Sequence, residues 1–466
     1  MQKIKKDLTK ALKNAAAPHK SIYFGGAKMQ HFLVDSAKQM LESTIYSILD
    51  RRDEVLTSPD SDFTRTRKIS FLQTILFPML AGNKDNNDEL LEFFGEKGLP
   101  RQSSMIERRN QVKPAAFITL FQDFSKCIPI LKLFNGHQVV SADGTRLNLP
   151  FNPYDHETYI QAIKGRKGIN QAHLNCLHDP LNDIFLDVEL QSVNAMDEKG
   201  AFCRLLSRQK LAGGPTHKRI YVADRGYASY NIFAHAIHNG QLFLIRVPES
   251  FAKTMCTGKN REGWLEEAYC DEVITVNISR RNTKKNKQQP NFHYIPSSGH
   301  YDFIPEGADG TDSLRLRVVK FPIGEDTFEY IVTNLPQYSF SLSSIKELYH
   351  LRWSTETAFR HLKYAANMVH MHSRKREFLL QEIYAKLTLY NFSSFAAAIV
   401  GRTQNETEKY KYVLNFTKTI SICIQYLKGV INDPESMIRK YKIPVRPGRR
   451  FPRNLRRQAA DTLNYR

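Results

Sequence analysis

The first 130 residues repeat their apolar side chains at helical intervals. Two series follow this spacing: Met40, Leu41, Ile45 and Leu49, and then Ile69, Leu72, Leu76 and Leu80. Side chains three or four residues apart share one face of a helix. We therefore predict an N-terminal helical region over residues 1–130. A helical module that binds a DNA end and a plain helical bundle fit this pattern equally well.

From about residue 135 the apolar residues alternate with a period of two, which is typical of strands. The strands expected first lie at 138–142, 146–149, 171–177 and 184–191. After a helix, the expected elements are a strand that ends at Asp224, a helix from about Tyr230 to His238 and a strand over Leu242–Val247. A meander of three strands followed by alternating helices and strands predicts an α/β fold, a mixed sheet flanked by helices.

Residues 251–335 interrupt this rhythm. They contain a basic loop and two strand-like runs, at 280–287, 314–321 and 327–333. Beyond them the helical pattern returns. We therefore predict a β-rich insertion at 251–335 that separates two parts of one α/β domain, 135–250 and 336–400.

Residues 401–466 are expected to form a C-terminal helical region with a basic tail. From Arg439 onward the tail carries ten Lys and Arg residues against the single acid Asp461. Two interpretations of the tail stay open, a solvated end or an arm that follows phosphates.

The charge balance indicates the kind of partner. The chain has 67 Lys and Arg against 47 Asp and Glu, a formal net charge of +20. Such an excess favours a polyanion, and nucleic acid fits it well. An anionic membrane surface would also fit, but there is no basic amphipathic helix with a strong apolar face and no apolar stretch as long as a membrane span. The six cysteines have no Cys-x-x-Cys spacing, which favours free thiols in a reducing, cytoplasmic compartment.

Three acidic residues stand out against this basic background. Asp143 follows the apolar run 139–142, Asp224 follows the run 220–223, and Glu356 lies in a stretch with helical spacing. A carboxylate at the end of a buried strand is costly unless it is paired or bound to a metal. Carboxylate oxygens suit Mg²⁺ or Mn²⁺. An acidic metal centre in a basic protein predicts phosphodiester chemistry on nucleic acid.

The stretch around Glu356 carries a polar stripe. At 100° per residue, Tyr349, Arg352, Glu356 and Lys363 fall within about 60° of arc on one helix. One interpretation is a surface face with an ordinary Arg352–Glu356 ion pair. The other is a DNA track, in which Arg352 and Lys363 hold phosphates on either side of a metal bound by Glu356.

These residues resemble a known family. The spacing of Tyr349, Arg352, Glu356 and Lys363 matches the Tyr-Arg-Glu-Lys signature of insertion-sequence DDE transposases of the cut-and-paste type. The sequences 143–145, Asp-Gly-Thr, and 224–227, Asp-Arg-Gly-Tyr, are also similar to the family. So are the position of the insertion and the tail 446–453.

The resemblance implies a ribonuclease-H-like catalytic fold and movement of a DNA element with terminal inverted repeats. It implies that Asp143, Asp224 and Glu356 bind two Mg²⁺ ions, which Mn²⁺ can replace, with Asp143 bridging them. It further implies strand cleavage, release through a DNA hairpin, strand transfer to a target, and a homodimer that holds two DNA ends. The corresponding location is the nucleoid of a prokaryotic cell.

The resemblance also implies which residues contact DNA. The candidates are Tyr349, Arg352, Lys363, Tyr227, Arg225, Arg360, Arg449 and Arg450. An aromatic residue of the insertion can stack on a flipped base, and Trp264, Phe328 and Tyr330 are the candidates.

Two other functions remain open. One is a DNA-binding regulator that keeps the fold and has lost transposition, although three unpaired acids serve no purpose in a pure binding protein. The other is a nuclease of the same fold that cuts DNA without joining it.

Overall fold

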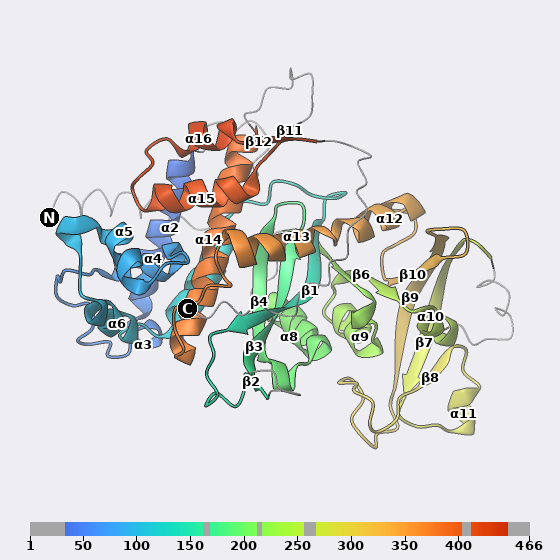
Figure 1. Cartoon of the computed structure of the whole chain (residues 1–466). Coiled ribbons are helices and arrows are strands. Elements are labelled where there is room, and N and C mark those ends of the chain that lie inside the picture. Colours follow the sequence, from blue (N-terminus) through green and yellow to red (C-terminus); the bar gives the residue numbers. More distant parts are fainter. Residues whose placement is uncertain (1–32, 162–167, 212–216, 256–266, 403–411, 446–466) are drawn as a thin grey trace.

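The computed structural model describes residues 33–161, 168–211, 217–255, 267–402 and 412–445. A large sheet lies at the centre of the molecule (Figure 1). The N-terminal and C-terminal helices gather at one end of it, and the strands of residues 270–333 lie at the other end (Figure 1).

The N-terminal part is helical over its described residues, as predicted. Its helices are α2 Val34–Ser47, η2 Ile48–Arg51, α3 Arg52–Val55, α4 Phe71–Leu80, α5 Asn86–Gly98, α6 Gln102–Asn110 and α7 Pro114–Cys127. The start of α4 illustrates the local cause. The side chain of Ser70 accepts a hydrogen bond from the backbone N–H of Gln73, and the Gln73 side chain accepts one from the backbone N–H of Ser70. This reciprocal cap satisfies two N–H groups that a helix start leaves without partners.

Within the described residues, ten strands form one mixed sheet, in the order β2-β3-β1-β5-β6-β10-β9-β7-β8, and β4 also pairs with β3. Their bounds are β1 Gln138–Leu149, β2 Tyr159–Ile160, β3 Ile169–Asp179, β4 Ile184–Ser192, β5 Arg219–Ala223, β6 Leu242–Val247, β7 Cys270–Ser279, β8 Phe292–Tyr294, β9 Thr311–Pro322 and β10 Phe328–Thr333. β1 is antiparallel to β3 and parallel to β5, and β5 is parallel to β6. The prediction of a mixed sheet flanked by helices is confirmed.

One strand prediction is wrong. The runs 138–142 and 146–149 belong to the single strand β1, because β3 pairs with β1 without interruption from Ser141 to Leu149. On the other side, β5 pairs with β1 only over Gln138–Ala142. Asp143 therefore lies within a strand, just past the point where the pairing with β5 stops.

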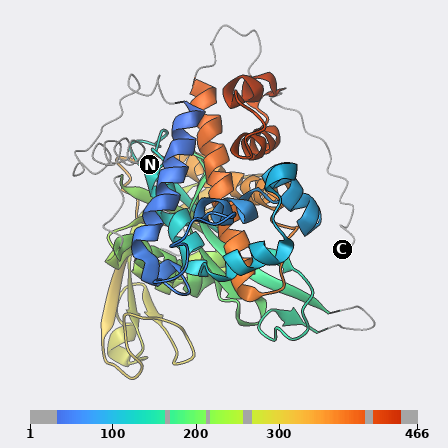
Figure 2. The same cartoon turned by 90° about the vertical axis from the view of Figure 1, so that its left-hand side faces the viewer.

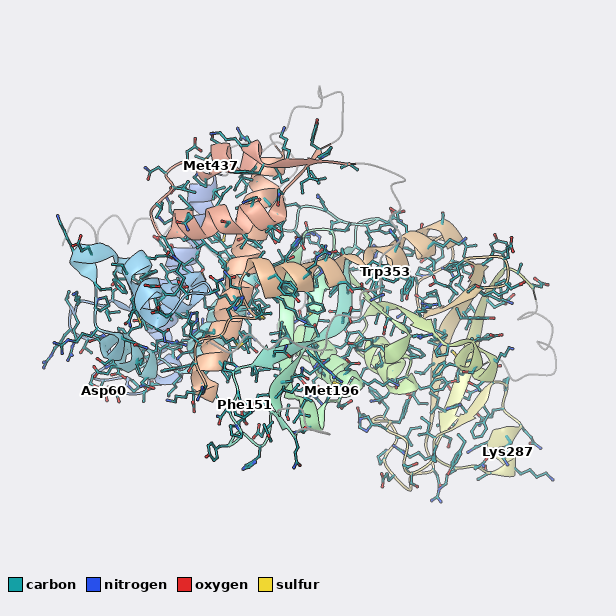
Figure 3. The ribbon with its side chains drawn as sticks, viewed as in Figure 1. Asp60, Phe151, Met196, Lys287, Trp353 and Met437 are labelled. Atoms are coloured by element: carbon teal, nitrogen blue, oxygen red, sulfur yellow. The ribbon has the colours of Figure 1, made fainter. Side chains whose placement is uncertain are left out.

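The strands between residues 251 and 335 continue the central sheet. β10 pairs antiparallel with β6, β9 pairs with β10, and β7 pairs with β9. The two runs predicted near the end of this region are β9 and β10. Two short helices accompany them, α10 Glu249–Met255 and α11 Lys284–Lys287. Part of the basic loop forms α11, and Lys287 lies far from the centre of the molecule (Figure 3).

Helices cover both faces of the sheet because alternate strand residues point to opposite sides. On one face, Val140 and Tyr221 pack with Phe202 of α8 Glu198–Leu211 and Phe233 of α9 Tyr230–His238. On the other face, Val139 and Val222 pack with α12 Leu342–Leu351. The remaining helical segments of this part are α13 Ser354–Arg360, η5 His361–Ala365 and α14 Arg376–Arg402.

The long helix α14 joins the helical parts of the molecule. It contacts α2, α4, α7 and α15, and α2 lies alongside it in a second view (Figure 2). The C-terminal elements are β11 Tyr412–Leu414, α15 Phe416–Leu427, α16 Pro434–Lys440 and β12 Lys442–Pro444. Among the helices of the described residues, none has the length and apolar character needed to cross a membrane.

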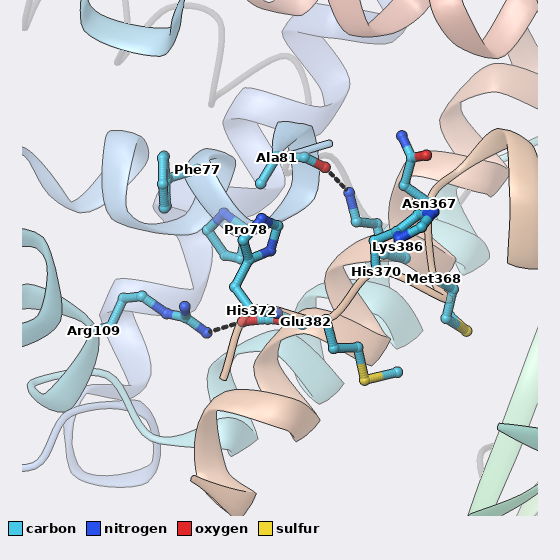
Figure 4. Close-up of a pocket in the computed structure, with 11 residues that line it drawn as sticks. Phe77, Pro78, Ala81, Arg109, Asn367, Met368, His370, His372, Glu382 and Lys386 are labelled. Atoms are coloured by element: carbon cyan, nitrogen blue, oxygen red, sulfur yellow. Dashed lines mark hydrogen bonds and ion pairs between the residues drawn. The ribbon is translucent and has the colours of Figure 1, made fainter. Parts of the chain in front are cut away.

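A pocket at the junction of α4 and α14 contains buried charges (Figure 4). Arg109 forms an ion pair with Glu382 at 3.1 Å. The Lys386 ammonium donates hydrogen bonds to the carbonyl oxygens of Met79, at 3.1 Å, and of Ala81. These contacts fasten the N-terminal helices to α14.

Candidate active site

The parallel pairing of β1 and β5 brings the first two acids together. The register ends at the pair Ala142 and Ala223, so Asp143 and Asp224 are the next residues of two neighbouring strands. Such strands lie about 4.8 Å apart, and residues in register point to the same face. Strand register alone therefore places the two carboxylates side by side.

The Asp143 carboxylate is mostly buried, with 21% of the side chain exposed. Its Oδ1 accepts a hydrogen bond from the Gly144 N–H at 2.8 Å. Burial raises the pKa of Asp143 to about 6, the Gly144 bond and Arg352 act against that rise, and the charges of Asp224 and Glu356 add to it. The charges of Asp224 and Glu356 therefore act on Asp143.

Asp224 begins the short helix η4 Arg225–Tyr227. Its Oδ1 accepts a hydrogen bond from the Gly226 N–H at 2.8 Å. A Cβ atom at position 226 would lie 3.0 Å from that same oxygen, which explains the value of glycine there. The Arg225 side chain is exposed, whereas Tyr227 is 4% exposed and packs edge-on against Phe202.

Glu356 lies on α13, but the continuous α-helix expected through it is wrong in detail. Between α12 and α13 the backbone tightens: Arg352 N–H donates to the Tyr349 carbonyl and Trp353 N–H to the His350 carbonyl, each three residues back. After α13 the chain widens into the π-helix η5. Irregular turns of this kind occur often at functional sites. Trp353 marks the tightened turn (Figure 3).

Arg352 points inward from the tightened turn. Its Nη1 lies 3.3 Å from Asp143 Oδ2, and its Nη2 lies 3.7 Å from Glu356 Oε1. The Arg352 side chain is 7% exposed, while that of Glu356 is 49% exposed. Arg352 thus bridges two of the predicted metal ligands, and in this structure its burial keeps it from the surface position of a phosphate contact.

Lys363 is half-buried, and its Nζ donates a hydrogen bond to Thr145 Oγ1 at 2.7 Å. Burial lowers the pKa of this ammonium. Because Thr145 lies two residues after Asp143 on the same strand, both side chains point to the same face. Lys363 is therefore held near the acids through the third residue of the Asp-Gly-Thr sequence.

A series of buried side-chain hydrogen bonds holds α13 in place. His178 Nδ1 lies 3.2 Å from Thr355 Oγ1, and His178 Nε2 lies 3.1 Å from Asp183 Oδ1. The Tyr390 hydroxyl donates to the same Asp183 oxygen at 2.7 Å. This series links β3 and α14 to the residue that precedes Glu356, so it fixes the helix that carries the third acid.

The donor chemistry of Asp143, Asp224 and Glu356 fits a divalent cation. Three carboxylates provide hard oxygen ligands, and a cation would relieve the repulsion that helps to raise the pKa of Asp143. Nevertheless, within the part of the chain that the structure describes, no three Asp, Glu, His or Cys side chains converge into a group that could hold a metal ion. The three carboxylates lie near one another, but they do not surround a common metal position.

The other predicted residues differ in exposure. Tyr349 is 4% exposed and packs in the core beneath α12, so its ring does not reach the surface. Arg360 is exposed on α13. Phe328 is partly buried and Tyr330 is buried, and Lys320 Nζ lies 4.4 Å from the centre of the Phe328 ring. Three further candidates lie outside the described residues: Trp264, Arg449 and Arg450.

Sequence reasoning missed the residues that support the site. Thr145 has a recognisable signal, because strand alternation places it on the same face as Asp143. His178, Asp183 and Tyr390 come together only through the tertiary fold, and no local spacing marks them.

Comparisons with known proteins complete this description. Among solved structures, the chain is similar to a piggyBac transposase determined in a synaptic complex with hairpin DNA, with 11% sequence identity and a TM-score of 0.41; the match covers 87% of this chain and 79% of that chain. No curated protein matches the chain. The family model for the transposase DDE domain matches residues 134–392, more than half of the chain. The chain therefore belongs to the transposase DDE domain family.

Proposed function

We propose that this protein is a catalytic DNA transposase that excises and integrates an insertion sequence by strand cleavage and strand transfer. The observation that carries the proposal is the arrangement of Asp143 on β1, Asp224 directly after β5 and Glu356 on α13, with Lys363 beside them. Family membership supports the same chemistry. The partner is double-stranded DNA, including terminal inverted repeats and a target, and a homodimer would hold two ends.

We propose that the catalytic unit is ribonuclease-H-like. The strand order β4-β3-β1-β5-β6, in which β1 is antiparallel to β3 and parallel to β5, supports this assignment. The strands of 251–335 are an insertion into this unit, and residues 1–130 hold the DNA end. Residues 401–466 form a basic C-terminal region, and the protein acts at the nucleoid of a prokaryotic cell.

Each group of the site has a proposed task. Asp143, Asp224 and Glu356 would hold two Mg²⁺ or Mn²⁺ ions, which activate the attacking hydroxyl and stabilise the leaving oxygen when bound. Lys363, positioned by Thr145, holds a phosphate of the bound strand next to the acids. The exposed side chains of Arg225 and Arg360 provide further phosphate contacts.

The test separates cleavage from binding. Asp143→Ala, Asp224→Ala and Glu356→Ala should each abolish strand cleavage in Mg²⁺ on a duplex that carries the DNA flanking the gene, and should retain binding of that duplex in a gel-shift assay without divalent metal. Near wild-type cleavage by any one of them would refute the triad. Joining of the cleaved ends to a target plasmid distinguishes a transposase from a nuclease, and absence of both reactions in the wild type would favour a regulator.

A further inference from the structure

The strongest unexplained feature of the site is the position of Arg352 between two acids. We propose that Arg352 is an internal counter-ion: in the DNA-free protein it holds Asp143 and Glu356 and opposes cation binding, and it leaves when DNA phosphate binds. The inference rests on the proposed function, because it assigns the acids to a divalent metal. It makes DNA binding and metal binding mutually dependent.

The contacts of Arg352 are those of an exchangeable group. Its distances to the carboxylates, 3.3 and 3.7 Å, are longer than the 3.1 Å of the buried Arg109–Glu382 pair. Its Nε is buried and has no hydrogen-bond partner among the described residues. An unsatisfied buried donor carries a free-energy cost, so the arrangement is not a closed structural ion pair.

The surroundings of Arg352 also favour a movement. It lies at the tightened turn between α12 and α13 rather than inside a regular helix. Its guanidinium lies 5.0 Å from the centre of the Trp353 ring, and that side chain is half exposed. A rotation toward solvent would keep the guanidinium near this ring while it reaches a DNA phosphate.

Mutual exclusion follows from charge. A divalent cation at Asp143 would meet the positive guanidinium that contacts the same carboxylate, so one must displace the other. A DNA phosphate that takes Arg352 would release both acids, and metal affinity would rise. By thermodynamic reciprocity, metal would raise the affinity for DNA by the same factor.

The test measures Mn²⁺ binding to the full-length, DNA-free protein by calorimetry, so it does not depend on activity. Arg352→Gln should bind Mn²⁺ about tenfold more tightly than the wild type, within the usual range of coupling of roughly 5- to 150-fold. Arg204→Gln is the matched control, because it removes the exposed Arg204 of α8 from its 2.7 Å pair with Glu189 of β4 and should leave the Mn²⁺ affinity unchanged. Equal affinities for the wild type and Arg352→Gln would overturn the proposal.

A second measurement needs no variant at position 352. Adding a duplex that carries the DNA flanking the gene should raise the Mn²⁺ affinity of the wild type, and an unchanged affinity would overturn the proposal. Asp143→Asn identifies the Mn²⁺ site, because it should weaken Mn²⁺ binding both in the wild type and in Arg352→Gln. If the wild type shows the coupling but never cleaves DNA, the counter-ion inference stands and the proposed function fails.

Discussion

Two regions of the molecule each contain a buried arginine and a nearby lysine, and they differ in how completely these cations are bonded. At the junction of α4 and α14, Arg109 donates to Gln381 at 3.0 Å, to Glu382 at 3.1 Å and to the Phe378 carbonyl at 3.1 Å. The second region, the acidic edge, contains Asp143, Asp224 and Glu356. There Arg352 has longer contacts, with Asp143 and Glu356, and its Nε has no hydrogen-bond partner among the described residues.

The two arginines differ in their partners and not in their burial. Arg109 and Arg352 are 6% exposed each, so burial alone does not separate them. What separates them is their partners: those of Arg109 are buried, whereas Glu356 is half exposed. An ion pair between two buried side chains with several partners fixes the structure, and a longer pair with a half-exposed partner can exchange partners.

The largest predicted effect on stability comes from loss of the Arg109–Glu382 ion pair. Arg109→Ala should lower the free energy of unfolding by about 3 to 5 kcal/mol, because it leaves the Glu382 charge buried and unpaired. Urea denaturation measures this change. Arg352→Ala, the matched replacement at the acidic edge, should cost less, about 1 to 2 kcal/mol, since Glu356 remains solvated and Asp143 is partly exposed and keeps its hydrogen bond from Gly144. Equal losses for the two variants would contradict the comparison.

The second prediction concerns Lys386, the lysine of the junction. Burial lowers its pKa to about 8 in the folded protein, from a usual value near 10.4 when unfolded. Between these two pKa values the unfolded chain binds more protons at Lys386 than the folded protein does. The contribution of Lys386 to the free energy of unfolding therefore rises with pH. The gain should reach about 2 to 3 kcal/mol from pH 8 to pH 10. Urea titrations compare the wild type with Lys386→Met, and the variant should lack this rise.

The third prediction concerns Lys363, the lysine of the acidic edge. Thr145→Val keeps the side-chain shape and removes the oxygen that accepts the hydrogen bond from Lys363. The loss of one such bond, about 1 kcal/mol, should slow single-turnover cleavage roughly fivefold and lower the free energy of unfolding in urea by no more than the same amount. Thr145→Ser retains the hydroxyl and should restore the rate. An unimpaired valine variant would show that Thr145 does not position Lys363.

Much of the fold could be predicted from local pattern. The helix α9 and the strand β6 have the predicted bounds, because their periods are clear and their neighbours are short turns. The pairing of Asp143 with Asp224 was implied by two apolar runs that end in an acid. The continuity of β1 could not be predicted, because its polar centre at 143–145 breaks the apolar pattern while hydrogen bonds to β3 carry the backbone through.

The partners of the site residues could not be predicted from the sequence in the same way. An ideal helix places Arg352 and Lys363 on one outward stripe, yet the tightened turn before α13 directs Arg352 to Asp143, and the π-helix directs Lys363 to Thr145. Both partners come from β1, which is distant in sequence. Helix spacing carries no information about such contacts, so it identified the residues but not their partners.

The smallest predicted effect sharpens the contrast between an internal and a surface arginine. Arg360 is exposed on α13, so a phosphate contact there would displace only solvent and counter-ions. Arg360→Ala should reduce the slope of log affinity against log salt by about 0.9 and lower affinity only a few-fold. The change should be the same with and without Mn²⁺, whereas the effect of Arg352→Gln on DNA binding should depend on the metal.

Arg204→Ala, on the opposite face of the sheet, is the control and should leave the slope unchanged. A slope unaffected by Arg360→Ala would remove this residue from the DNA surface, and a metal-independent effect of Arg352→Gln would make the two arginines equivalent.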